Sequence, residues 1–442
     1  MSANFSAAAG QGQITQFEIT SNYDKKNLSI MSGTIVLDYY ESILDNTIRA
    51  TASLMDSGYR KDGESASVIE EKDVNLNVGE FVNLKFVDGL GNELNFTGNN
   101  KLRILQTRDI QEDVNKVSYT IDMTSVEYHD NPKEKCAVDK RYDGPIDENV
   151  RKILSECLRT SKSIDADKTL NPYNFRGYNQ TPMHVCTWLA PRSIPDISGA
   201  NQDLAGYFFY ETADGYNFKS IDVLFSQSPR RKLIYNQIVE ATPPQGYDGK
   251  ILSYSFDSTF NLKKLKETGA LGQSKIRTFD LKPGNLYAES EFNYENQFKR
   301  SNTGGKEPIK YGDDQDETTK RFFQIKDYGV MPEGTNAEKQ LEKSKDEINF
   351  DVDGIIRQSL MRYNSLFAIK LSIVIPGDFS LRAGELIHCD FPEVSSDKLK
   401  TYSRKKSGIY MISDLCHHIT KNGSYTRLNL VRDSIGRKST TR

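Results

Sequence analysis

The sequence predicts a β-rich α+β protein made of two homologous small antiparallel β-barrels with two smaller inserted α/β modules. Short runs of β-branched and aromatic residues alternate with polar ones, and clusters of Gly, Asn, Asp and Ser separate them. Residues 76–86 also resemble residues 381–391, which indicates an internal repeat. With Gly counted instead of Tyr, the apolar share is about 39%, below the usual ~45–50%. Yet 21 Phe, 23 Tyr and one Trp are too many aromatics for a disordered chain, so several thin layers are expected.

Composition narrows the class of protein. A length of 442 residues is typical of a chain with about three domains. Lys plus Arg number 58 against 61 Asp plus Glu, so the chain lacks the basic excess of proteins that coat nucleic acid. The most apolar stretch, residues 366–375, contains Lys370 and is about half the length of a membrane span. The first 16 residues show no basic segment followed by an apolar one, so we expect no Sec export.

The cysteines predict a reducing environment. There are five, widely spaced and without a CxxC pair: Cys136, Cys157, Cys186, Cys389 and Cys416. An odd number with this spacing is typical of reduced thiols in a cytosolic protein and excludes a secreted disulfide scaffold.

Strand patterns dominate the first 130 residues. They cover residues 33–40, 47–56, 77–88, 101–109 and 118–128. Regular spacing of short alternating strands predicts a small antiparallel barrel or sandwich.

The pattern then changes to that of a small α/β module. Apolar residues at helical spacing predict a helix over 147–158, with Asp147 capping its start. A second helix is expected from Thr181, with Pro182 at its first position and Pro191 beyond its end. Two strand-like runs around Asp214-Gly215 predict a hairpin with a type I′ turn, in which both central residues have positive φ.

Strands return from about residue 232, after which the chain becomes polar over 267–349. Apolar spacing between Ile355 and Tyr363 predicts one more helix. Four strands are expected to close the chain, over 368–375, 381–391, 408–419 and 424–433.

The internal repeat is the most informative feature. LNVGEFVNLKF (76–86) and LRAGELIHCDF (381–391) share four of eleven residues, including a Gly-Glu pair, and four further positions are apolar in both. A strand beginning Ser-Tyr-Thr follows each copy, at 118–120 and 424–426. Gly before a strand supplies a turn or bulge conformation that a Cβ would hinder. Two unrelated barrels could share such a turn by chance, but the repeated order of elements favours duplication.

These patterns divide the chain into five parts. They are a first barrel (1–130), an α/β module with the Asp-Gly hairpin (131–228), a second barrel (229–266 and 350–436), an inserted polar module (267–349) and a tail (437–442).

Only one group of residues resembles a metal site. His388-Cys389 and Cys416-His417-His418 have suitable ligand types. Neighbours on a strand point to opposite faces, so at most one residue of each group is expected to converge. Cysteine among apolar strand residues is usually a small core residue, and we predict no metal here.

Other polar or aromatic motifs are also better explained without a catalytic or ligand-binding role. SNTGGKEP (301–308) resembles a phosphate loop but has Arg300 where the first glycine belongs, and Glu307 where Ser or Thr should be, so a flexible loop is expected. The acids Asp313, Asp314, Asp316 and Glu317 have no apolar surroundings to raise a pKa and indicate a solvated loop rather than a glycosidase pair. The basic stretch 398–406 is expected to be a solvated hairpin loop, the alternative being a contact with a neighbouring subunit or an acidic partner. Trp188 and Met183 are expected in the core of the module rather than on a ligand platform. The sequence therefore predicts no catalytic, cofactor-binding or metal residues, no cofactor and no enzyme activity.

Three segments resemble a known family. Residues 364–392 are similar to the barrel strand pair of phage tail hubs and of related injection-system spikes, with an apolar strand, Pro-Gly, a turn and Leu-x-x-Gly. Residues 34–58, with Tyr39, Tyr40, Glu41 and Ser42 before a strand ending Asp56-Ser57-Gly58, resemble the start of the central baseplate hub of contractile-tailed phages. Residues 178–225 resemble the helix and hairpin of the same hubs. The resemblance covers about residues 14–436 and is weakest over 267–349.

The resemblance implies a structural role. Members of this family form trimers, in which three chains with two barrels each build a pseudo-sixfold ring around a channel. Such a ring adapts a sixfold tail tube to a threefold central spike and leaves a passage for DNA. Expected partners are the spike, tail tube or tube-initiator proteins and baseplate wedge proteins, with no membrane involved. The expected location is the virion tail baseplate, and the host cytoplasm during assembly.

Two alternatives stay open at this point. One is a tail-associated cell-wall or polysaccharide hydrolase, which would need a convergent acid/base pair in a cleft. The other is the hub of a phage-derived contractile injection system. For a channel that passes DNA, we expect acidic or neutral lining residues, because basic ones would bind phosphates. Lysines of 398–406 inside the channel would refute this expectation.

Overall fold

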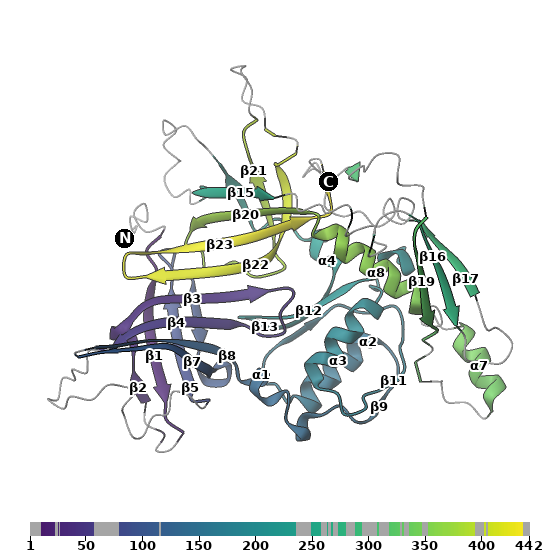
Figure 1. Cartoon of the computed structure of the whole chain (residues 1–442), viewed down its shortest axis with the longest axis horizontal. Helices are drawn as coiled ribbons and strands as arrows, with labels where there is room; N and C mark the ends of the chain where they lie inside the picture. Colours follow the sequence, from purple (N-terminus) through teal and green to yellow (C-terminus); the bar gives the residue numbers. More distant parts are fainter. Residues whose placement is uncertain are drawn as a thin grey trace.

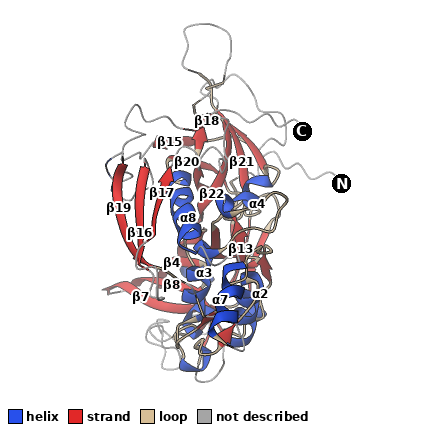
Figure 2. Ribbon diagram, turned by 90° about the vertical axis from the view of Figure 1, so that its right-hand side faces the viewer, coloured by secondary structure: helices blue, strands red, loops and turns tan. Residues whose placement is uncertain are grey.

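Strands from both ends of the chain form one large sheet. The computed structural model describes residues 10–22, 25, 27–56, 79–114, 116–235, 249–257, 263, 267, 273–279, 288–293, 307–308, 318–327, 329–330, 336–346, 352–393, 402–403 and 405–435. Within these residues, 14 strands join in a mostly antiparallel sheet, and helices are few (Figures 1 and 2). The predicted β-rich α+β class is confirmed.

The strands of this sheet are β1 (Gln13–Thr20), β2 (Asn27–Ser29), β3 (Thr34–Ser42), β4 (Arg49–Asp56), β5 (Phe81–Val87), β6 (Glu93–Phe96), β7 (Leu102–Asp113), β8 (Lys116–Ser125), β14 (Arg231–Ile234), β15 (Ser253–Asp257), β20 (Ile369–Pro376), β21 (Leu386–Asp390), β22 (Gly408–Thr420) and β23 (Gly423–Arg432). The main path runs β15-β20-β23-β22-β3-β4-β8-β7-β5-β1-β2, with β21 and β14 attached beside β22, and β6 beside β5. In Figure 1 the C-terminal strands β20, β23 and β22 lie directly above the N-terminal β3 and β4.

The sheet contains the same five-strand unit twice. We call β3, β4, β5, β7 and β8 the first half, and β15, β20, β21, β22 and β23 the second half. In the first half the pairs are β3–β4, β4–β8, β8–β7 and β7–β5. In the second half the pairs, in the same order, are β15–β20, β20–β23, β23–β22 and β22–β21. All of these pairs are antiparallel, so the halves match in direction as well as in order.

The match extends to single residues at the start of each third strand. Gly79 and Gly384 both have positive φ, +60° and +87°, which is the conformation expected for the repeated Gly-Glu pair. The Glu80 carbonyl accepts a hydrogen bond from the Ile104 amide at 3.0 Å, and the carbonyl of Glu385 accepts one from Ile412 at 2.9 Å.

A bulge in the fourth strand of each half shows which residues of the two halves are equivalent. The fourth strand of each half shifts register just after these amides, between Ile104 and Gln106 and between Ile412 and Asp414. Ile104 lies opposite Met123, and Ile412 opposite Leu430, so Met123 and Leu430 occupy equivalent places. Ser118 therefore corresponds to Tyr425, and the two Ser-Tyr-Thr sequences are out of register by one residue.

Both halves share one apolar core. Its buried side chains come from the first half (Leu37, Ala52, Ile104, Ile121), from the second half (Leu371, Ile412, Leu428) and from β1 (Phe17). The alternation of buried residues with half-buried or exposed ones along β20 shows why such strands form, since one face covers the core and the other is more accessible. The two halves are therefore packed on each other rather than separated by the module between them in sequence.

The inserted α/β module lies beside one end of the sheet (Figure 1). It contains α2 (Ile146–Lys152), continued by a π-helical turn to Cys157, α3 (Pro182–Leu189), α4 (Ile221–Ser226) and a three-stranded sheet of β10 (Ile164–Ala166), β13 (Gly215–Ser220) and β12 (Tyr207–Thr212). A short ladder joins β9 (Arg141–Tyr142) to β11 (Phe175–Arg176). The module has its own apolar core, which includes Ile153, Cys186 and Phe218.

Helix α8 (Val352–Leu366) forms where the apolar spacing predicts a helix. It follows the polar module in sequence, within the predicted second barrel, but Val352 belongs to the core of the α/β module. The Ser359 hydroxyl also donates to the Pro191 carbonyl of that module at 2.7 Å. This helix therefore connects the second half of the sheet to the module.

The polar segment forms a separate small sheet. The strands β16 (Gln273–Phe279), β17 (Ala288–Asn293) and β19 (Thr318–Ile325) pair in the order β17-β16-β19, followed by α7 (Ala337–Asp346). Figure 2 shows these strands beside α8. No helix in the described part of the chain is both long and apolar enough to span a membrane.

Some local predictions need correction. The predicted strand 118–128 ends at Ser125 and continues as α1 (Val126–Asp130). Asp147 does not cap α2, because Pro145 is the cap residue and Oδ1 of Asp147 instead accepts from the amide and hydroxyl of Thr169. Thr181 precedes α3 with Pro182 in its first turn, as predicted.

The predicted hairpin forms, but not with the predicted turn. Thr212 pairs with Gly215, so the two loop residues are Ala213 and Asp214. Gly215 has φ of +133°, whereas Asp214 is not among the residues with positive φ, which excludes a type I′ turn centred on Asp214-Gly215. Gly215 is required instead because a Cβ there would overlap the backbone of Ser163.

Candidate functional site at the junction of the two halves

The two halves meet where β22 pairs with β3. Seven residue pairs form an antiparallel ladder from Asp414–Ser42 to Thr420–Val36. Along β3, Leu37, Tyr39 and Glu41 are buried, while Tyr40 between them is exposed. The alternation therefore places an acidic side chain on the inner face of the sheet, two residues after a buried tyrosine.

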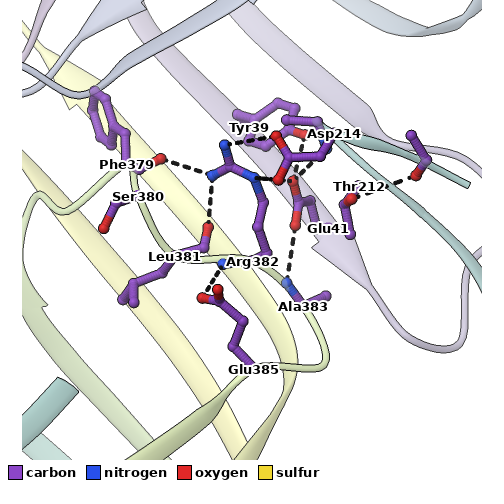
Figure 3. Close-up of polar contacts among 12 residues, drawn as sticks. Tyr39, Glu41, Thr212, Asp214, Phe379, Ser380, Leu381, Arg382, Ala383 and Glu385 are labelled. Carbon is purple, nitrogen blue, oxygen red and sulfur yellow. Dashed lines mark hydrogen bonds and ion pairs between the residues drawn. The ribbon is translucent and has the colours of Figure 1, made fainter. Parts of the chain in front are cut away.

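Glu41 connects three distant parts of the chain. Its Oε1 accepts hydrogen bonds from the Tyr39 hydroxyl and from the Ala213 amide, each at 2.8 Å. Its Oε2 accepts from the Ala383 amide at 2.9 Å. Ala213 lies in the turn between β12 and β13, and Ala383 in the loop before β21. One carboxylate therefore joins the first half, the module and the second half; Figure 3 shows Glu41 with Ala383 and Arg382.

Arg382 supplies the opposite charge. Its Nε lies 4.0 Å from Oε1 of Glu41 and 2.9 Å from Oδ2 of Asp214, and its Nη1 donates to the carbonyls of Phe379 and Leu381. Burial raises the pKa of Glu41 to about 6, although Arg382 and the two backbone amides oppose this shift. These contacts all hold protein segments together, so the arrangement fixes geometry.

A second buried charge cluster fastens the module to the first half. The Lys162 ammonium lies 2.6 Å from Oε1 of Glu211 and 2.8 Å from Oε2 of Glu127. Oε2 of Glu211 accepts from the Ile48 amide, just before β4, at 3.1 Å. Burial raises the pKa of Glu211, and the two carboxylates raise the pKa of Lys162 in spite of its burial. The module is therefore held to the first half by the buried Lys162–Glu127 ion pair and by the hydrogen bond from the Ile48 amide to Glu211.

The His and Cys residues that resemble metal ligands lie in different parts of the sheet. His388 lies opposite Ile409 near the start of β22, whereas His417 and His418 lie near its end. His417 is buried, with Nδ1 3.0 Å from Oγ1 of Thr426 and its ring stacked on Tyr39 at 5.9 Å. Burial lowers the pKa of His417 to about 3.

One part of the sequence prediction about these residues is wrong. Cys416 and His418 are two positions apart and share the outer face, so both converge on Asp38, at 3.7 and 2.6 Å from its Oδ1. Cys389 is buried in the core. Over the described ranges, no group of three or more His, Cys, Asp and Glu side chains is arranged to hold a metal ion.

The predicted loops lie mostly outside the described residues. Of SNTGGKEP, only Glu307 and Pro308 are described, and they form β18, which pairs with β24 (Ser434–Ile435). The acids Asp313, Asp314, Asp316 and Glu317 lie outside the described residues, as do residues 398–401 and 404 of the basic stretch. Lys406, which is described, donates to the Tyr254 hydroxyl of β15.

Met183 and Trp188 occupy different environments. Met183 is buried in the module core, whereas Trp188 packs against that core and lines a pocket of about 400 Å³ with Tyr173 and Phe175. The guanidinium of Arg192 lies 4.0 Å from the indole centroid. Trp188 is thus only partly a core residue.

The sequence prediction did not identify the residues of the junction. In the sequence, Glu41 stands out only as part of the Tyr-Tyr-Glu-Ser stretch, and its backbone partners lie 172 and 342 residues further along the chain. The alternation along the strand was the available signal of burial. Glu41 lies two and four positions from Tyr39 and Leu37, so its side chain points to the same buried face.

Comparison with known proteins gives a fold but no sequence match. No protein-family model matches the chain, and no curated protein matches it significantly. A tail protein from Neisseria meningitidis MC58 is 9% identical, with a TM-score of 0.51, over 96% of this chain and 100% of that protein. The 43 kDa tail protein of prophage MuSo2 from Shewanella oneidensis gives the same identity and TM-score over 95% and 99%. The chain shares its fold with these tail proteins over nearly its whole length, which confirms, at the level of fold, the resemblance to phage tail hubs.

Proposed function

We propose that this protein is the structural baseplate hub of a contractile phage tail. In this proposal three chains form a ring, each half of the sheet contributes one small barrel, and the six barrels surround a channel. The ring joins a sixfold tail tube to a threefold central spike, and DNA passes through it. The protein acts by burying interfaces and matching symmetries and has no catalytic role.

One observation carries the proposal. The same five-strand unit occurs twice and the two copies join edge to edge, through β22 and β3. A chain with two equivalent units can occupy two of six positions in a ring, so threefold symmetry of chains gives near-sixfold symmetry of units. The shared fold with two tail proteins supports the same role.

The rigid junction fits this role. A ring that transmits load between a tube and a spike needs its two units held in one fixed relation. Glu41, which is buried, and Arg382, whose side chain is 15% exposed, hold that relation at the inner face of the sheet, where salt screens their attraction little. We keep the proposed division of the chain into a first barrel (1–130), an α/β module (131–228), a second barrel (229–266 and 350–436) and an insert (267–349).

The test is the mass of the assembled protein. Multi-angle light scattering of the purified chain, alone and with the spike protein from the same gene cluster, should give three copies per particle. Monomers under both conditions would overturn the proposal. A zymogram on host cell walls should show no clearing by this chain alone, and clearing would favour a hydrolase instead.

A further inference from the structure

The internal junction shows which edges of the sheet are suited to join neighbouring subunits. In the second half, β22 first pairs with β21, through Leu386–Met411 and its neighbours, and after the bulge it pairs with β3. The fourth strand of a unit thus has two successive partners on one side. The first partner belongs to its own unit and the second to the next unit.

The equivalent strand of the first half uses only the first of these partners. β7 pairs with β5 through Phe81–Arg103 and Val82–Leu102, and its bulge follows at the same place as in β22. Beyond the bulge, no strand within the described residues pairs with this side of β7. This stretch, Gln106 to Asp113, is what we call the β7 edge.

The first strand of the second half has the complementary edge. β3 pairs with β4 on one side and with β22 on the other. Its counterpart β15 pairs with β20 through Ser253–Val374 to Asp257–Lys370, and no described strand pairs with its other side. In the strand order, β15 stands at one end of the sheet and β7 in the far half, so these two edges are not positioned to pair within one chain.

Both edges have features of a contact surface. The β7 edge has a second register shift, between Arg108 and Gln111, and there it exposes Ile110, 45% accessible, while Leu105, 42% accessible, precedes the edge. Beside β15, Leu252 is 43% accessible. A long exposed strand edge is a template for pairing with another chain, and folded proteins otherwise shorten, charge or cover it.

We propose that the β7 edge of one subunit pairs with β15 of the next subunit, antiparallel and in the register of the internal β22–β3 junction. The inference rests on the proposed ring and names its subunit interface. Repeating one head-to-tail contact, within chains and between them, places every unit of the ring in the same kind of sheet junction.

The register follows from the ladders on each side. In β22, His418 lies opposite Tyr425, and in β7, Gln111 lies opposite Ser118. Ser118 corresponds to Tyr425, so Gln111 takes the place of His418, which pairs with Asp38 of β3.

The partner residue on β15 is found in the same way. Asp38 lies opposite Thr51 of β4, and Ser255 lies opposite Ser372 of β20. Ile121 and Leu428 are equivalent, because they lie two positions before Met123 and Leu430. Their partners Ala52 and Ile373 are therefore equivalent, and so are the preceding residues Thr51 and Ser372.

Gln111 of one subunit is therefore placed opposite Ser255 of the next. Applying the same procedure to the pair Cys416–Tyr40 places Arg108 opposite Asp257, with the second register shift of β7, between Arg108 and Gln111, lying between the two pairings.

Disulfide trapping tests this register in the full chain. Residues directly opposite on antiparallel strands have Cα atoms about 4.5–5.5 Å apart, within disulfide range, whereas diagonal neighbours are about 7–8 Å apart. The test variant is Gln111→Cys with Ser255→Cys, and the matched control is Gln111→Cys with Ser253→Cys. Gln111, Ser255 and Ser253 are all exposed. Both variants carry Cys157→Ser and Cys416→Ser, which remove the partly exposed native thiols.

After a mild thiol oxidant, the test pair should give covalent trimers on a non-reducing gel, at least about tenfold more than the control pair, and reductant should abolish them. Circular dichroism and light scattering before oxidation verify that both variants fold and assemble like the parent. Trimers by light scattering with no preferential crosslink at 111–255 would overturn this interface and leave the proposed function standing. A parent chain that stays monomeric with and without the spike would overturn both.

Discussion

The two Gly-Glu turns of the molecule have the same backbone but different surroundings. Around the first, the Asn22 amide donates to Glu80 at 2.5 Å, and the Arg103 side chain donates to the Gly79 carbonyl at 2.6 Å. Around the second, Gly384 lies against Tyr210 of the α/β module, and the preceding Arg382 and Ala383 contact the buried Glu41. The first turn is held by β7 of its own half and by the segment after β1, whereas the second fastens the other half and the module. The two copies thus share their backbone geometry, but only the second serves as an attachment point for other parts of the chain.

The largest effect is expected where that attachment depends on a buried charge. Glu41→Ala leaves Arg382, whose side chain is only 15% exposed, without its inner carboxylate, and two backbone amides without their acceptor. Breaking a buried pair in this way should lower the free energy of unfolding by about 3–5 kcal/mol in urea titrations at pH 7. The control is Asp214→Ala, which removes the 72% exposed partner of the same arginine and should cost about 1 kcal/mol or less. Equal losses would show that Glu41 has no special role.

The two glycines should respond differently to a single methyl group. At Gly384 an added Cβ would overlap the Tyr210 hydroxyl, and φ is +87°, so Gly384→Ala should cost about 3 kcal/mol. At Gly79 the nearest atom would be Nε of the Arg103 side chain at 3.0 Å, and φ is +60°, so Gly79→Ala should cost about 1 kcal/mol. Thermal unfolding of the two variants in parallel checks the order, and the reverse order would contradict the comparison.

The buried carboxylate should also make the second turn sensitive to pH. The folded-state pKa of Glu41, about 6, lies above its ordinary value of 4.5, so the folded state binds this proton first. Its contribution to stability therefore rises by about 2 kcal/mol as pH falls from above 6 to below 4.5, and it is lost again as pH rises through 6.

Glu41→Gln isolates this contribution. His417 acts in the opposite direction, because its lowered pKa, about 3, makes the fold lose stability as pH falls below 6.5. The parent-minus-variant difference in urea unfolding, measured from pH 7.5 to 4.5, cancels the His417 effect. A difference that does not change over this range would show that the pKa of Glu41 is not raised.

The smallest effect is expected at the first turn. Arg103→Ala removes one hydrogen bond to the Gly79 carbonyl and the stacking on Phe81, at a partly exposed site. The loss should be about 1 kcal/mol in the same urea assay. A loss as large as that of Glu41→Ala would mean that both turns are held equally firmly.

The sequence predicted the parts of this molecule that depend on local patterns. The Gly-Glu repeat revealed the duplicated strands, because a turn with positive φ leaves a local signature in both copies. The strand β1 was missed, since a register shift between Ile14 and Gln16 interrupts its alternation. The predicted type of the turn after Thr212 is wrong, because the need for Gly215 comes from Ser163, a residue just before β10 that lies far from the turn in sequence.

The junction could not be predicted in the same way. Glu41 finds its partners only after the whole chain folds, and an acid next to two tyrosines has no local feature that marks it as buried. The pairing of β22 with β3 likewise joins residues about 380 positions apart, beyond any periodicity along the chain. Duplication helps here because a contact seen once within the chain predicts where its counterpart belongs.

The most direct test of the central claim is the symmetry of the assembled protein in electron micrographs. End-on projections of the purified hub should show six similar lobes of two alternating kinds around an open centre, with exact threefold symmetry. A closed centre, or a particle without a threefold axis, would contradict the proposal that this chain forms the adaptor ring.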